Sequence, residues 1–155
     1  MIEIAFYQLQ KTDISQILPK LLEKTLKLNK KALVMASTKV QVENINDFLW
    51  SYKSTGWLPH GTDRDGKAPH QPIWISTNPE PLNQANYLFL TDGAIHNNID
   101  IFERCFVLFN SDNLKTRDFL RGKWLEYKAM GYILTYWEET KDGIWQRNNN
   151  VANLE

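Results

Sequence analysis

Apolar residues recur along the chain with two spacings, and each spacing predicts a different kind of element. Short runs that are apolar at nearly every position predict β-strands, whereas apolar residues three or four positions apart predict α-helices. Strands are expected at 2–9, 31–37, 72–76, 86–90, 104–109 and 132–138. Helices are expected at 13–28, 38–52 and 113–132. Asp13 and Asn113 are suitable N-caps for two of these helices, and Pro19 is expected to kink the first or delay its start.

The order of these elements predicts the fold class. Strand, helix, strand and helix follow one another up to residue 52, which indicates a βαβ unit and a parallel sheet. The run Lys31–Ser37 is almost entirely apolar, as is typical of a strand buried on both faces. We therefore expect an α/β fold: a single three-layer domain over residues 1–138, mainly a parallel sheet with helices on both faces. Residues 139–155 are expected to form a polar, partly disordered C-terminal tail.

The helix at 113–132 has one face that is rich in positive charge. Because consecutive helical residues turn by about 100°, four of its side chains share an arc of about 60°: Arg117, Arg121, Trp124 and Lys128. Leu114 and Leu125 border this arc. We expect it to be exposed, with three cations around one indole, which suits an acidic peptide that also carries an apolar side chain. A merely solvated basic face is an equally good interpretation.

A second face of the same helix is expected to pack on the core. It carries Phe119, Leu120, Tyr127 and Met130. Lys123 falls on this face too, and it would have to extend its charged end outward along its aliphatic stem.

Composition narrows the possible functions. The 155 residues include 18 Lys and Arg and 18 Asp and Glu, so the formal net charge is zero. Direct nucleic-acid binding needs a cationic surface, so it is the weaker hypothesis here. The single cysteine, Cys105, lies in an apolar run and is expected to be a buried hydrophobe in a reducing compartment. No apolar run of about 18 residues and no signal peptide are recognisable, so we expect a cytoplasmic protein without a membrane span.

Nucleotide chemistry finds no support in the motifs. Neither a P-loop nor a G-x-G-x-x-G pattern is present. The turns Gln10–Asp13 and Ser37–Lys39 lack glycine, so we expect neither to bring successive backbone N–H groups onto a phosphate. We therefore expect no nucleotide site, no cofactor and no catalytic residues.

Residues 54–71 are rich in Gly, Pro and Asp and are expected to form a long loop. The loop holds His60, Asp63, Asp65 and His70, whose spacing matches neither a zinc nor a calcium site. We expect solvated turn residues and no metal. The alternative function is a degenerate nucleotide hydrolase or a metal-dependent nuclease that uses the His60–His70 loop.

Tryptophan is the other unusual feature of this region. The kernel Trp57-Leu58-Pro59 follows Trp50 on the second helix. An indole in such a loop is either a lid on the core or an exposed anchor for another protein, and the sequence leaves both open.

Several segments, taken in order, resemble the chi subunit of the bacterial DNA polymerase III holoenzyme. They are Phe6-Tyr7-Gln8-Leu9, Leu49-Trp50, Trp57-Leu58-Pro59-His60-Gly61, Pro72-Ile73, Phe102-Glu103-Arg104, and the helical set Arg117, Arg121, Trp124, Tyr127, Lys128, Gly131 and Tyr132. The resemblance implies a non-catalytic accessory subunit of a DNA-directed DNA polymerase complex, on a nucleotide-binding-like fold that uses no nucleotide.

The resemblance also implies two partners, and contact with nucleic acid only through them. The acidic, Phe-terminated tail of single-stranded DNA-binding protein would bind at Arg117, Arg121 and Trp124. Leu125 stands where sites of the family carry a basic residue, and Lys123 or Lys128 would take over that charge. The psi subunit, which links chi to the clamp loader, would bind at Trp57 and its neighbours. Those neighbours are Trp50, Leu58 and Pro59.

Overall fold

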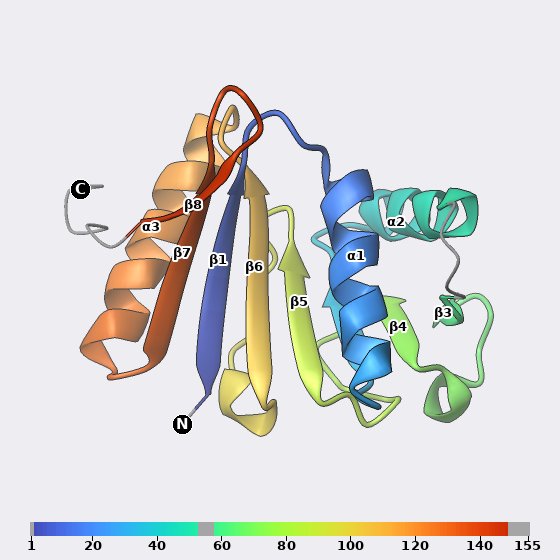
Figure 1. Ribbon diagram of the computed structural model, residues 1–155. Coiled ribbons are helices and arrows are strands. Elements are labelled where there is room, and N and C mark those ends of the chain that lie inside the picture. Colours follow the sequence, from blue (N-terminus) through green and yellow to red (C-terminus); the bar gives the residue numbers. More distant parts are fainter. Residues whose placement is uncertain (1, 53–57, 149–155) are drawn as a thin grey trace.

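The computed structural model describes residues 2–52 and 58–148. Within these residues eight strands form one sheet in the order β3-β4-β2-β5-β6-β1-β7-β8 (Figure 1). The strands are β1 (Glu3–Leu9), β2 (Ala32–Met35), β3 (His60–Thr62), β4 (Ile73–Ser76), β5 (Tyr87–Thr91), β6 (Arg104–Asn110), β7 (Ile133–Glu139) and β8 (Trp145–Arg147). Every neighbouring pair is parallel except β7 and β8, which are antiparallel.

Three α-helices flank the sheet: α1 (Ile14–Lys27), α2 (Lys39–Ser51) and α3 (Leu114–Ala129). Short 3-10 turns occur at η1 (Ala68–His70) and η2 (Ile99–Ile101). Residues of α1 and α2 join one hydrophobic cluster, and residues of α3 join a separate cluster on the other face of the sheet. The predicted α/β fold with helices on both faces is therefore confirmed. No helix in the described ranges is both long enough and apolar enough to cross a membrane.

The start of α1 follows from its capping residue. The carboxylate of Asp13 accepts from the backbone N–H and the hydroxyl of Ser15, and the side chain of Gln16 accepts from the N–H of Asp13. This reciprocal cap satisfies donors that would otherwise lack a partner at the first turn. The helix begins at Ile14 and continues through Pro19. Of the two effects expected of this proline, the late start is wrong and the kink stays a prediction.

The sheet is larger at both edges than the sequence predicts. The region expected to be a loop at 54–71 contributes β3 and η1, while residues 53–57 lie outside the described ranges. The segment assigned to the tail begins within β7, turns, and returns as β8. The backbone N–H of Asn148 then donates to the carbonyl of Tyr136. Residues 149–155 are not among those described.

Candidate functional site

Helix α3 carries the candidate peptide site, and both of its ends are set as the sequence predicts. The side chain of Asn113 accepts from the N–H of Thr116 at 3.1 Å. After the C-cap at Met130, Gly131 adopts a φ of 86°, a left-handed conformation that glycine enters without steric cost. The helix therefore runs from the end of β6 to the start of β7 and packs on the face of the sheet opposite α1 and α2 (Figure 1).

The orientation of α3 about its axis differs from the prediction. Trp124, expected on the surface, is only 7% exposed. Its indole packs edge-on against Phe6, with ring centroids 5.3 Å apart, and against Tyr136, at 5.4 Å. Phe119 and Met130, expected in the core, are 46% and 63% exposed. The prediction of an exposed indole is therefore wrong, as is half of the predicted core face.

The physical reason lies in Lys123. It falls in the middle of the arc that was assigned to the core, where a charge is costly. The arc through Leu120, Trp124 and Tyr127 contains no charged residue, and it is the arc that meets the sheet. The uncharged arc was the signal in the sequence that could have identified the buried face.

Three cations remain beside the buried indole, and we call Arg117, Arg121 and Lys128 the α3 basic cluster. Arg117 and Arg121 are half-buried, and Lys128 is exposed. Arg117 also approaches the adjacent Asp118, with Nε 3.5 Å from Oδ1. The Nε atoms of both arginines and the indole Nε1 of Trp124 are buried and have no hydrogen-bond partner in the structure. These groups lie along one side of α3. An acceptor from outside would meet the exposed parts of the arginines and Lys128, because the three unpartnered atoms themselves are covered.

Tyr136 packs against Trp124 beneath this cluster and is hydrogen-bonded to Gln8, and neither residue was predicted from the sequence. The hydroxyl of Tyr136 donates to the side-chain oxygen of Gln8 on the neighbouring strand. Burial raises the pKa of Tyr136 to about 12. Arg121 acts to lower this pKa through a hydrogen bond and through its charge, and the charge of Arg117 acts in the same direction. The two guanidinium groups therefore lie close to this hydroxyl. Glu138 acts on the same hydroxyl and places one negative charge at the border of the cluster.

The apolar part of the candidate site is also different from the expected one. Leu114 and Leu125 border the cluster and are exposed, whereas the indole of Trp124 lies beneath it. Apolar contacts with an incoming peptide would therefore fall mainly on these leucines. Peptide binding at the five expected residues (Arg117, Arg121, Trp124, Leu125 and Lys128) stays a prediction.

The second candidate surface lies at the opposite edge of the sheet. Trp50, near the end of α2, is 70% exposed, and its ring centroid lies 4.7 Å from that of His60 on β3. An exposed indole supported by a second ring is a suitable anchor for another protein. Pro59 is half-buried, Leu58 is buried and so offers little surface, and Trp57 lies outside the described residues.

The histidines expected in the long loop are not arranged as a metal site. His60 is buried on β3, and its Nδ1 lies 2.7 Å from the carbonyl oxygen of Leu58. His70 is exposed in η1, and Asp65 caps its own turn by accepting from the N–H of Thr62. Across residues 2–52 and 58–148, no three His, Cys, Asp or Glu side chains gather closely enough to hold a metal ion. No observation favours the nuclease alternative.

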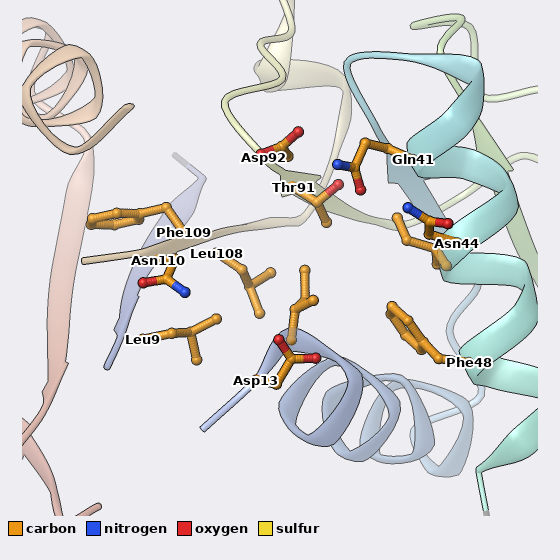
Figure 2. A pocket seen from close by; sticks show the side chains of 12 residues that line it. Leu9, Asp13, Gln41, Asn44, Phe48, Thr91, Asp92, Leu108, Phe109 and Asn110 are labelled. Atoms are coloured by element: carbon orange, nitrogen blue, oxygen red, sulfur yellow. The ribbon is translucent and has the colours of Figure 1, made fainter. Parts of the chain in front are cut away.

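A crevice of about 300 Å³ opens at the carboxyl ends of β1, β5 and β6 (Figure 2). Its lining residues are Leu9, Asp13, Ile14, Gln41, Asn44, Ile45, Phe48, Thr91, Asp92, Leu108, Phe109 and Asn110. This is the usual ligand position of open α/β sheets. The lining carries two carboxylates, Asp13 and Asp92, and no cation. Its charge is therefore unfavourable for a phosphate, and the absence of a nucleotide site stays a prediction.

Comparison with known proteins assigns the chain to a family. Residues 1–135 match the family model described as DNA polymerase III chi subunit, HolC. The chain belongs to the DNA polymerase III chi subunit family. The matched residues of this chi-family chain include the whole of α3 and Trp50, whereas Tyr136 and Glu139 lie beyond them.

A curated relative points to the same chi family. The chain is 30% identical over 104 residues to the probable DNA polymerase III subunit chi of Rickettsia prowazekii (strain Madrid E). The alignment covers 62% of the chain and 63% of that relative, so the match spans somewhat less than two thirds of the relative's length.

Proposed function

We propose that the protein is a non-catalytic accessory subunit of DNA polymerase III that connects two other proteins during DNA replication. The observation that carries this proposal is the chi family match, which extends over residues 1–135 and includes both candidate surfaces. One partner is the acidic, aromatic-ended tail of single-stranded DNA-binding protein, at the α3 basic cluster. The other is the psi subunit, at Trp50.

The chemistry of the α3 basic cluster supports an acidic peptide as its ligand. Arg117 and Arg121 are only half-buried and Lys128 is exposed beside them, so the cluster offers cationic N–H donors at the surface. Carboxylate oxygens satisfy such donors with charge-assisted hydrogen bonds. Leu114 and Leu125 are exposed next to these donors and would contact the aromatic end of the tail.

The positions of the two surfaces support a connecting role. Trp50 contacts β3 at one edge of the sheet, and the α3 basic cluster lies over β7 near the other edge. Six strand spacings of about 4.8 Å separate β3 from β7. At a separation of roughly 29 Å two partners can bind at once without competing for the same side chains.

Replacement of Arg121 by alanine tests the tail site. A hydrogen bond to a charged group contributes about 1.5–3 kcal/mol, so we expect Arg121→Ala to weaken binding of the tail peptide by about tenfold or more. Isothermal titration calorimetry with a synthetic acidic peptide that ends in phenylalanine measures this change. Lys115→Ala is the matched control, because it removes an exposed cation from another face of the same helix. Equal affinities for the Arg121→Ala variant and the wild type would rule out this site.

A further inference from the structure

The turn between β1 and α1 holds an oxyanion that comes from the chain itself. The backbone N–H groups of Gln10, Lys11 and Thr12 all donate to Oε1 of Glu139, at 2.9, 2.7 and 2.6 Å. The hydroxyl of Thr12 donates to the other carboxylate oxygen. Glu139 is 3% exposed and lies more than 120 residues away in sequence. Four donors from three consecutive residues therefore surround one buried carboxylate.

This arrangement corrects the expectation from the sequence. A turn without glycine was expected to be unable to bring successive N–H groups onto an anion. The turn does so although none of the described residues with a positive φ lies between 10 and 13. Glycine is needed only where φ must be positive or the backbone must approach a ligand very closely. Converging backbone N–H groups of this kind form anion-binding concavities in many proteins.

The place of the turn in the fold is also that of a ligand site. The chain leaves β1 through α1 toward β2, and it leaves the adjacent β6 through α3 toward β7, on the other face and toward the other edge (Figure 1). The carboxyl ends of β1 and β6 therefore form the point at which the connections diverge. Open α/β sheets bind their ligands at this point. The donor groups precede the N-cap of α1, so they are additional to those of the helix terminus.

We propose that the turn Gln10–Thr12 is an oxyanion-binding site that the protein fills with its own Glu139 carboxylate, and that this site binds inorganic phosphate once the carboxylate is removed. Burial alone would raise the pKa of Glu139, but the hydrogen bonds from Thr12, Gln10 and Lys11 outweigh burial and lower it. The carboxylate is thus charged and acts as a built-in ligand. This inference does not depend on the identity of the protein's partners.

The built-in ligand has a consequence for the native protein. Glu139 is the last residue of β7, so its carboxylate fastens the β7–β8 connection to the turn after β1. A ligand that the fold holds in place has an effective concentration far above the millimolar concentration of a free anion. The wild-type turn is therefore closed to phosphate, and the neighbouring crevice lacks the anion position that a nucleotide would use.

Replacement of Glu139 tests the proposal. Inorganic phosphate is titrated at pH 7 and constant ionic strength into ¹⁵N-labelled wild type, Glu139→Ala and Glu139→Gln. In Glu139→Ala we expect the NMR signals of the Gln10, Lys11 and Thr12 amides to shift until they saturate. The apparent affinity for phosphate should be at least about tenfold higher than that of the wild type. Glu139→Gln is the matched control, because its neutral side-chain oxygen can still accept from the turn and keep it filled.

Two results would overturn the proposal. One is a folded Glu139→Ala variant whose three turn amides do not respond to phosphate, and the other is an equal response in the wild type. If Glu139→Ala does not fold in chloride, phosphate at the same ionic strength is expected to restore its native spectrum. Phosphate also stabilises folded proteins in general, because it is excluded from their surface. The stability that Glu139→Gln gains in phosphate measures this general effect. A gain for Glu139→Ala that does not exceed the gain for Glu139→Gln would likewise overturn the proposal.

Discussion

Replacement of Trp124 by alanine is expected to lower the free energy of unfolding by about 3–5 kcal/mol, the usual cost of removing a large buried aromatic side chain. The indole is almost fully buried and packs edge-on against Phe6 and Tyr136. Its loss removes these ring contacts and leaves a cavity between α3 and the sheet. For a chain of this length the melting temperature should fall by roughly 6–20 °C.

The control for this prediction is the next residue. Leu125 lies on the same helix but is exposed, so Leu125→Ala should change the stability by no more than about 0.5 kcal/mol. Urea unfolding of both variants, followed by circular dichroism, measures the difference. If Trp124→Ala were as stable as Leu125→Ala, the indole would not belong to the core. Trp124→Phe should keep part of the packing and lose less stability than Trp124→Ala.

This result also affects how peptide-binding data are interpreted. Loss of tail binding in Trp124→Ala would not identify the indole as a direct contact, because the same substitution loosens the helix that carries Arg117 and Arg121. Only Arg121→Ala, which leaves the ring contacts of Trp124 in place, reports on the cluster itself. The two variants are therefore needed together, with stability and affinity measured on each.

The central strands were predictable because their burial is uniform. In β2 and β4 every residue is buried, and a short run with apolar residues at nearly every position shows this directly. β3 and β8 were missed for a different reason, since β3 is also buried throughout. Each is only three residues long and contains polar residues or glycine. Each is a strand because it pairs with a neighbouring strand, and its own residue pattern does not indicate one.

The rotation of α3 shows what periodicity can and cannot determine. Spacing placed Arg117, Arg121 and Lys128 on one side of the helix, and that grouping does not depend on how the helix packs. Which side faces the sheet depends on the partner surface, here Phe6 and Tyr136. Phe6 lies on β1, far from α3 in sequence, and Tyr136 lies on β7, the strand that follows α3. The periodicity of a single helix contains no information about either residue.

The Glu139 contact was beyond sequence reasoning altogether. Its donors are backbone N–H groups, which every residue except proline possesses, so no residue type marks them. Its acceptor is one of 18 acidic side chains in the chain. Only the path of β7 beside β1 brings the carboxylate to the turn.

Replacement of Trp50 by alanine is expected to weaken binding of the psi subunit by about 2 kcal/mol, or roughly 30-fold, because a large exposed indole at an interface typically dominates the binding energy. The stability should change by no more than about 0.5 kcal/mol, since the side chain is mostly in solvent. Surface plasmon resonance against the psi subunit of the same organism measures the affinity. Val40→Ala is the matched control, because Val40 is an equally exposed apolar residue near the other end of α2. Equal affinities of Trp50→Ala and Val40→Ala for the psi subunit would show that Trp50 is not part of the interface.

The same measurement decides whether the two surfaces act independently. Substitutions more than about 10 Å apart with no shared partner usually have additive effects, and Trp50 and Arg121 belong to opposite edges of the sheet. Trp50→Ala should therefore leave the affinity for the tail peptide unchanged, and Arg121→Ala should leave the affinity for psi unchanged. The double variant should lose both partners, each by the amount seen in the single variant. Coupling between the two losses would mean that the partners contact each other or share a surface, and the protein would then not connect them through two separate sites.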